Sequence, residues 1–233
     1  MNETLRVAPR WLRSTPIAHR GLFANPGTPE NSPAAFQAAI DRGLAIELDV
    51  RLSADGVPMV FHDSDLDRLT AAAGKLAGHS AAELSGLALL GTAERIPSLA
   101  MVLEQVAGRV PLLIELKNLT ELPGPLERAV LDCMNGYPGE LALQSFNPLS
   151  VRWLRLRAPE IVRGQLSARP AGIPLARSTQ PHFVAYRVDD LPHPAVTRAR
   201  ERGMPVLAWT VRTEAQREIA GRHANNVIFE EDR

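Results

Sequence analysis

Residues 45–63 read AIELDVRLSADGVPMVFHD, and they decide where the strand and helix pattern of the chain is interrupted. The first eight of them alternate apolar and charged side chains, as in a strand with one apolar face. Asp55-Gly56 is typical of a tight turn, and the residues before Val57 are too few for a crossover helix. We predict a hairpin or an extended return here, and a hairpin centred on this turn would place Asp49 roughly opposite His62.

Strand-like runs recur on both sides of this stretch. Helix-like stretches separate most of them, such as residues 32–43, with Ser32 as N-cap, Pro33 at the first helical position and Gly43 as a stop. The alternation predicts a parallel α/β sheet, and eight strands favour a closed barrel over an open sheet. Residues 64–95 are expected to form an excursion from the barrel mouth. The predicted strands are 16–19, 45–51, 57–62, 111–117, 141–146, 162–166, 182–188 and 205–211, and the other helices 98–108, 147–159, 193–203 and 213–223.

The composition favours one domain, residues 1–233, that acts on a small molecule. Lysine plus arginine (26) equals aspartate plus glutamate (26), so no basic excess drives binding to nucleic acid. Cys133 is the single cysteine and has no internal disulfide partner. No stretch is apolar enough for a signal peptide or a membrane span, so we expect a cytoplasmic protein without stable membrane insertion. The composition leaves the oligomeric state open.

Acidic side chains interrupt two otherwise apolar strands. Strand alternation places Glu47 and Asp49 on one face, and in PLLIELK, residues 111–117, it places Glu115 opposite the apolar neighbours. Buried carboxylates are costly unless they are paired or bind a metal. One interpretation pairs Glu47 with Arg51 and the other two acids with arginines elsewhere. The other is a site for one hard divalent cation, Mg²⁺ or Ca²⁺, because no cysteine or histidine cluster suited to zinc accompanies the acids.

Two histidines stand at strand ends, where a barrel carries its catalytic residues. His19 ends the first run and precedes Arg20, and His62 ends the third run and precedes Asp63, which could fix its tautomer. Either histidine alone could be structural. Together with three acids and the cations Arg20 and Lys117, they provide what phosphoryl chemistry needs, which is charge neutralisation and proton transfer.

The ordered motifs of the chain resemble those of glycerophosphodiester phosphodiesterases. They are HRG (19–21), PENSPAAF (29–36), ELDVRLSADGVPMVFHD (47–63), LDRLT (66–70), IPSL (96–99), IELK (114–117), QSFNP (144–148) and AWTVRT (208–213). The resemblance implies a (β/α)8 TIM barrel related to the phosphatidylinositol-specific phospholipase C fold, irregular between its second and third strands. It also implies one bound divalent cation and cleavage of glycerophosphodiesters to glycerol 3-phosphate and an alcohol.

The resemblance also implies roles for individual residues. His19 and His62 match the acid/base pair, and Glu47, Asp49 and Glu115 match the metal ligands. Asn31 matches a substrate-polarising residue, and Glu30 one that orients His19 or the loop. The matching substrate and phosphate contacts are Arg20, Glu30, Asn31, Lys117, Gln144, Phe146 and Trp209, although a Phe or Trp at a strand end is more often a core residue, and the core is the favoured place for Phe146.

In the implied mechanism, one histidine takes the proton of the glycerol 2-hydroxyl, a cyclic phosphate forms, and the other histidine protonates the departing alcohol. We assign His19 as the first base, with the reverse assignment as the alternative. Two further functions stay open. One is lysophospholipase D-like hydrolysis of lipid phosphodiesters, and the other is a non-catalytic barrel that binds phosphate esters.

Overall fold

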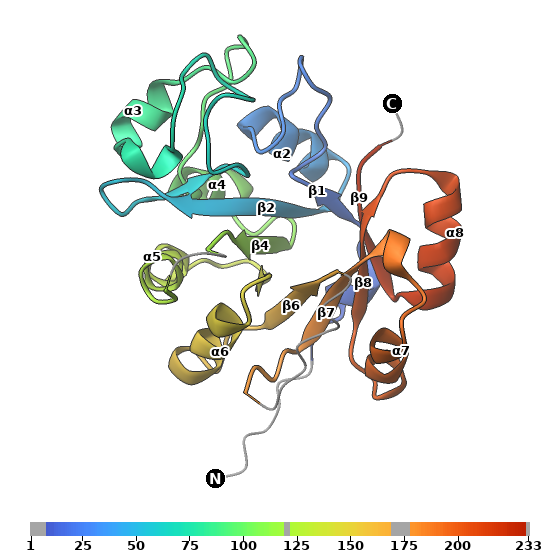
Figure 1. Ribbon diagram of the computed structural model, residues 1–233. Helices are drawn as coiled ribbons and strands as arrows, with labels where there is room; N and C mark the ends of the chain where they lie inside the picture. The colour runs from blue at the N-terminus through green and yellow to red at the C-terminus, as the bar shows by residue number, and fades with distance from the viewer. Residues whose placement is uncertain (1–7, 119–121, 169–177, 232–233) are drawn as a thin grey trace. The chain divides into compact units, whose positions relative to one another are not determined.

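The computed structural model describes residues 8–118, 122–168 and 178–231 (Figure 1). The chain forms two compact units: the first unit is Ala18–Leu141, and the second unit is Met1–Ile17 with Ala142–Arg233. Parallel strands alternate with helices in chain order. The chain therefore has the (β/α)8 barrel fold that the sequence predicts.

The first unit is built around the parallel pair β2 and β4. Their register places Asp49 beside Glu115 and Glu47 beside Leu113. Helix α2 begins as predicted, because the Ser32 side chain accepts a hydrogen bond from the backbone N–H of Ala35. The elements of this unit are β1 (Ile17–His19, which begins at the end of the second unit), α2 (Pro33–Asp41), β2 (Ala45–Leu52), β3 (Pro58–Val60), α4 (Leu99–Val106), β4 (Leu112–Leu116) and α5 (Pro125–Met134).

The hairpin after β2 forms, but its predicted register is wrong by one residue. Strand β3 pairs antiparallel with β2, with Val50 opposite Val60, and the N–H of Phe61 donates to the carbonyl of Asp49 at 2.9 Å. The turn has three residues rather than two, because Ser53 pairs with Val57 and Gly56 takes a φ of +80°. Phe61 rather than His62 therefore lies opposite Asp49.

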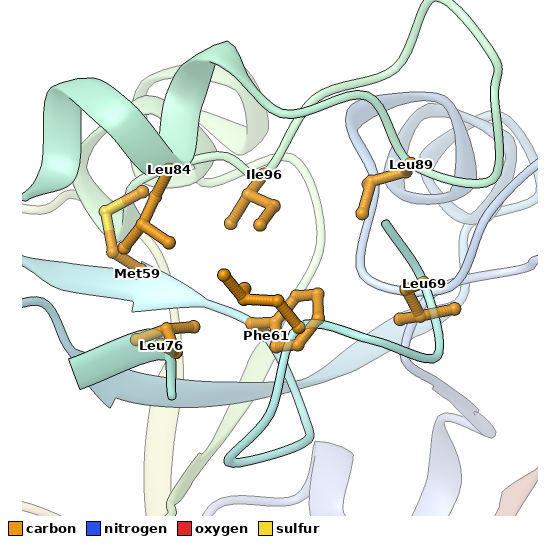
Figure 2. Packing of buried hydrophobic residues seen from close by; sticks show 8 residues of the cluster. Met59, Phe61, Leu69, Leu76, Leu84, Leu89 and Ile96 are labelled. Atoms are coloured by element: carbon orange, nitrogen blue, oxygen red, sulfur yellow. The ribbon is translucent and has the colours of Figure 1, made fainter. Parts of the chain in front are cut away.

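Residues 64–95 leave β3 as an excursion with a hydrophobic core of its own. The segment contains η1 (Leu76–Gly78) and α3 (Ala81–Gly86), which begins with a capping box formed by Ser80 and Glu83. Figure 2 shows the labelled side chains of this cluster pointing toward one another, with Met59 of β3 among them. The buried members are Met59, Phe61, Leu66, Leu69, Leu76, Leu84, Leu89 and Ile96.

The second unit is a run of parallel strands in chain order, from β5 to β9. Gly164 on β6 has no side chain because the ring of Phe183 on β7 occupies that place, with ring carbons 2.2 Å from where a Cβ would lie. The elements are α1 (Trp11–Ser14), β5 (Leu141–Ser145), α6 (Pro148–Arg157), β6 (Arg163–Ser167), β7 (Phe183–Arg187), η2 (Val188–Asp190), α7 (Pro194–Glu201), β8 (Val206–Val211), α8 (Glu214–His223) and β9 (Asn226–Phe229).

The eighth parallel strand is not one of the eight that the sequence predicts. Predicted strand 57–62 becomes β3, which is antiparallel, and β9 (Asn226–Phe229) completes the parallel set. Strand β9 has only four residues and begins with a polar one, so it lacks an alternating pattern. The Asn226 side chain donates to the carbonyl of Thr15 at 2.7 Å, which gives the polar residue a structural place. Among the described residues, no helix has the length and apolar character needed to cross a membrane.

Candidate active site

Three buried carboxylates lie together on the first unit. Glu47 and Asp49 are two residues apart on β2 and share a face, and the register of the parallel pair adds Glu115 of β4 to that face. Their exposed fractions are 1%, 0% and 6%, respectively. Each offers an oxygen, and these oxygens all lie within 4.8 Å of one another. The strand alternation seen in the sequence thus produces a compact acidic cluster.

Two cationic side chains contact this cluster. Lys117 Nζ lies 2.7 Å from Glu115 Oε1 and 3.0 Å from Asp49 Oδ1. Arg20 Nε lies 3.3 Å from Asp49 Oδ2, so the expectation that Asp49 pairs with a distant arginine is met in part. Arg51 donates to the backbone carbonyls of His62 (2.8 Å) and Lys117 (3.3 Å).

The electrostatics of the cluster split the three carboxyl pKa values. Burial alone would raise the pKa of Asp49, but Lys117 and Arg20 overcome it and hold that pKa far below the usual value. Burial, with the charges of Asp49 and Glu115, raises the pKa of Glu47 well above the usual range. Burial also raises the pKa of Glu115 to about 7, against the opposing effect of Lys117. Without a cation, Asp49 is therefore ionised at neutral pH, while Glu47 and Glu115 tend toward the protonated form.

These residues fit a divalent cation. Oxygen ligands lie about 2.0 to 2.6 Å from Mg²⁺ or Ca²⁺, so two ligands of one ion are separated by at most about 5 Å. The 4.8 Å limit on the separation of the three carboxylate oxygens satisfies this requirement. A cation among Glu47, Asp49 and Glu115 would also offset the burial and the charge repulsion that raise the pKa of Glu47. The three acids could therefore hold one ion.

The loop after β1 reaches the cluster through two residues with left-handed backbone. Arg20 has a φ of +58° and Asn31 a φ of +56°, and the Asn31 N–H donates to the Arg20 carbonyl at 2.9 Å. Asn31 Nδ2 then donates to Asp49 Oδ2 at 2.9 Å, and the N–H of Arg20 donates to Glu47 Oε2 at 3.2 Å. Non-glycine residues adopt this backbone at a cost, which is typical of functional loops.

Gly21 explains the third position of the HRG motif. Its φ is +79°, and a Cβ at this residue would lie 2.8 Å from the backbone carbonyl carbon of Ala35 on α2. The N–H of Leu22 donates to the Ala35 carbonyl at 2.9 Å, so loop and helix approach at backbone distance. Glycine is required here for both conformation and space.

The two histidines lie near different carboxylates. His19 Nε2 is 4.0 Å from Glu47 Oε2, at the end of β1. His62 Nδ1 is 2.6 Å from Asp63 Oδ1, as the sequence predicts for a carboxylate that fixes the tautomer. Burial of the His62 ring lowers its pKa, while the charge of Asp49 opposes this shift. Both imidazoles belong to the same unit as the carboxylates.

Glu30 holds the loop rather than an imidazole. Its Oε1 accepts from Arg20 Nη1 at 2.6 Å, and its backbone N–H donates to Asn25 Oδ1 at 3.1 Å. Arg68 adds two hydrogen bonds to the same carboxylate, at 2.7 and 2.8 Å. Burial would raise the pKa of Glu30, but Arg68 and Arg20 lower it overall. Sequence reasoning did not select Arg68, although it lies within the LDRLT motif.

Three predicted substrate contacts belong to the second unit. Gln144 on β5 is buried, with no hydrogen-bond partner for Oε1 within the described residues. Trp209 on β8 is half-buried, and its ring meets that of Phe146 edge to face, with centroids 5.4 Å apart. Buried polar atoms without a partner are uncommon unless water or a ligand supplies one. Their relation to a substrate stays a prediction.

Comparison with known proteins places this geometry in one family. A sequence profile of the glycerophosphoryl diester phosphodiesterase family matches residues 19–229. The chain belongs to this family. The chain is 31% identical over 219 residues to the glycerophosphodiester phosphodiesterase of Caldanaerobacter subterraneus subsp. tengcongensis, with 86% of each chain covered. It is also 32% identical over 213 residues to Bacillus subtilis YhdW, covering 85% of this chain and 86% of the relative.

Solved structures support the assignment to the glycerophosphoryl diester phosphodiesterase family. The Oleispira antarctica phosphodiesterase in complex with its product sn-glycerol-3-phosphate matches with a TM-score of 0.83 and 27% identity, covering 93% of this chain and 92% of that one. The glycerophosphodiester phosphodiesterase from Agrobacterium tumefaciens matches with a TM-score of 0.71 and 27% identity, covering 94% and 96%. Membership confirms the enzyme class that the sequence resemblance predicts, a phosphoric diester hydrolase.

Proposed function

We propose that this chain hydrolyses small glycerophosphodiesters to glycerol 3-phosphate and an alcohol, with one divalent cation and two histidines. The observation that carries the proposal is the set of three buried carboxylates, with oxygens within 4.8 Å, beside His19. The product sn-glycerol-3-phosphate bound to the Oleispira antarctica relative supports the substrate class. The prediction that residues 1–233 act as a single domain belongs to the same proposal.

Glu47, Asp49 and Glu115 would hold the cation. When bound, Mg²⁺ or Ca²⁺ supplies Lewis-acid polarisation of the phosphoryl oxygens, which lowers the cost of charge that develops there. Arg20 and Lys117, both at the edge of the carboxylate cluster, provide fixed positive charge for the same oxygens. Asn31 donates to Asp49 and keeps that carboxylate oriented.

The histidines move the protons. We assign His19 as the base that takes the proton of the glycerol 2-hydroxyl as its oxygen attacks phosphorus and a cyclic phosphate forms. His62 gives a proton to the alcohol oxygen whose bond to phosphorus breaks. Water then opens the cyclic phosphate with the roles reversed: His62 takes the water proton and His19 returns one to the 2-oxygen. Asp63 keeps the proton of the neutral His62 ring on Nδ1 and so leaves Nε2 for this exchange.

We propose Gln144, Phe146 and Trp209 as further substrate contacts. Gln144 Oε1 and the Trp209 indole N–H are both buried without a hydrogen-bond partner among the described residues. The Gln144 oxygen can accept a hydrogen bond from a substrate hydroxyl, and the indole N–H can donate one to it. Both groups suit a polar alcohol or glycerol moiety better than an acyl chain. Small deacylated substrates such as glycerophosphocholine are therefore the first choice.

The test compares substrates and histidine variants. Wild-type protein supplied with Mg²⁺ or Ca²⁺ should release glycerol 3-phosphate from glycerophosphocholine faster than it cleaves lysophosphatidylcholine. His19→Ala and His62→Ala should each lower kcat at least about 100-fold with the melting temperature preserved. Faster cleavage of lysophosphatidylcholine would show that the substrates are lipid phosphodiesters rather than small glycerophosphodiesters. Near-normal turnover in both variants would overturn the two-histidine mechanism, and no turnover on either substrate would favour a non-catalytic barrel.

A further inference from the structure

Arg68 contacts both Glu30, on the loop after β1, and Asp63, the carboxylate beside His62. It lies on the excursion 64–95, outside the strands that carry the acids. Its Nη1 and Nη2 donate to Glu30 Oε2 and Oε1 at 2.8 and 2.7 Å, and its Nε donates to Asp63 Oδ2 at 2.6 Å. One guanidinium therefore joins the loop after β1 to the carboxylate that holds His62.

The contacts form a continuous chain of alternating charge. Arg20 Nη1 binds Glu30 Oε1 at 2.6 Å, Arg68 links Glu30 to Asp63, and Asp63 Oδ1 meets His62 Nδ1 at 2.6 Å. Asp63 uses one oxygen for His62 and the other for Arg68. Each anionic member is thus held from both sides, which fixes the orientation of its carboxylate.

The protonation of Asp63 follows from these contacts. Burial would raise its pKa, but hydrogen bonds from Arg68 and His62 lower the pKa of Asp63 to about 2. An ionised carboxylate only accepts hydrogen bonds, so in the neutral ring the proton lies on Nδ1 and Nε2 is free of it. Arg68 thereby acts on the reactive nitrogen of His62 without touching the ring.

The backbone that carries Arg68 is anchored more firmly than its exposure suggests. The side chain is 45% exposed, yet Leu66 and Leu69 on either side of it are 0% and 1% exposed in the excursion core. The backbone N–H of Leu66 donates to the carbonyl of Gly74 at 2.9 Å, and the carbonyl of Leu69 accepts from the N–H of Leu90 at 2.7 Å. The excursion core therefore presents this arginine in one place.

The Arg68 contacts are expected to affect the orientation of the active-site side chains more than the stability of the fold. The Arg68 side chain is 45% exposed, so solvent screens its ion pairs, and Arg20 still pairs with Glu30 when Arg68 is removed. Groups that orient a catalytic or ligating side chain typically change activity about 10- to 100-fold when they are removed. The bidentate geometry toward Glu30 also needs a planar guanidinium, which lysine does not provide.

We propose that Arg68 is a positioning residue that couples the orientation of His62, through Asp63, to that of Arg20, through Glu30. The proposal rests on the proposed function of His62 and Arg20 in phosphodiester hydrolysis. It assigns a role to the excursion 64–95, which is to deliver this arginine to the active site.

The first test uses kinetics and chemical rescue. Arg68→Ala should lower kcat about 10- to 100-fold with the melting temperature preserved, and Arg68→Lys should recover only part of the loss. Arg95→Ala is the matched control, because Arg95 is an exposed arginine of the same excursion that donates to backbone carbonyls. Millimolar guanidinium ion should restore turnover in Arg68→Ala and leave Arg95→Ala unchanged. The double variant Asp63→Asn/Arg68→Ala should be no slower than the slower single variant.

The second test does not need turnover. In protein carrying ¹⁵N-labelled histidine, with His62 assigned by the spectrum of His62→Gln, the wild type should show the neutral ring protonated at Nδ1. Arg68→Ala should show a mixture of tautomers, and guanidinium ion should shift it back. A wild-type tautomer in Arg68→Ala, or multiplicative kinetic losses in the double variant, would overturn the proposal. A different outcome would contradict the proposed function alone: no turnover by the wild type, while the His62 tautomer still changes in Arg68→Ala and returns with guanidinium ion.

Discussion

Asn31 donates its side-chain Nδ2 to Asp49 Oδ2 at 2.9 Å from a backbone whose φ is +56°. The contact joins the loop after β1 to the middle of the carboxylate cluster. Asp49 already forms ion pairs with Lys117 and Arg20. The neutral amide of Asn31 therefore orients the Asp49 carboxylate rather than neutralising its charge. Strained backbone that carries such a contact is expected at a site where orientation matters.

Asn31→Gly separates the amide from the backbone conformation. Glycine adopts positive φ freely, so this variant should keep its melting temperature while losing the hydrogen bond to Asp49. We expect kcat/KM, or the affinity for the divalent cation, to fall about 10- to 100-fold. Asn31→Ala should show the same loss of activity plus about 1 kcal/mol of destabilisation, measured by denaturant unfolding. Unchanged activity in Asn31→Gly would mean that the amide does not orient Asp49.

The stabilising effect of the cation should depend on pH. Burial raises the pKa of Glu115 to about 7 in the cation-free protein, and the folded state therefore binds this proton more tightly than the unfolded chain. The resulting contribution to stability is present below about pH 4.5 and is lost as the pH rises through about 7. A cation competes with the same proton, so its effect on the melting temperature should grow across this window.

The measurement is the melting temperature with EDTA and with excess Mg²⁺ or Ca²⁺ at pH 5.5 and pH 8. We expect the larger increase at pH 8, and Glu115→Gln should reduce the difference, with Glu47 as the remaining carboxyl whose pKa is raised. Glu104→Gln is the control, because Glu104 is an exposed glutamate on α4 of the same unit. Equal increases at both pH values would contradict proton competition at Glu115.

Gly21→Ala tests the close approach between the loop and α2. The φ of +79° and the 2.8 Å distance from a Cβ to the Ala35 backbone should together cost about 2 kcal/mol or more. Gly43→Ala isolates the cost of the backbone conformation, since Gly43 has a φ of +64° and nothing lies within 4 Å of the position that its Cβ would take. Denaturant unfolding should show the Gly21 variant to be the less stable by at least about 1 kcal/mol. Equal losses would place the whole cost in the backbone conformation.

The sequence predicts the carboxylate cluster because a strand has a period of two residues. Glu47 and Asp49 must share a face once residues 45–52 form a strand, and a parallel neighbour with Glu115 at its end completes the arrangement. The N-cap at Ser32 and the start of α2 follow from local hydrogen bonding in the same way. Such features depend on residues a few positions apart, which a single sequence shows directly.

Features that depend on tertiary contacts were missed or shifted. The hairpin register moved by one residue because Gly56 makes a three-residue turn from a dipeptide that also suits a two-residue turn. Strand β9 was missed because four residues that begin with Asn226 show no alternation. Arg68 was missed because its partner Glu30 lies 38 residues away, and no local pattern links the two.

The central claim is that Glu47, Asp49 and Glu115 hold one divalent cation that phosphodiester hydrolysis requires. The most direct measurement is release of glycerol 3-phosphate from glycerophosphocholine by chelator-treated protein as Mg²⁺ or Ca²⁺ is added back. We predict no turnover without the cation, single-site saturation on its return, and at least about 100-fold less turnover in Glu47→Gln and Glu115→Gln at every cation concentration. Full turnover in the chelated wild type, or normal cation activation in both variants, would contradict the claim.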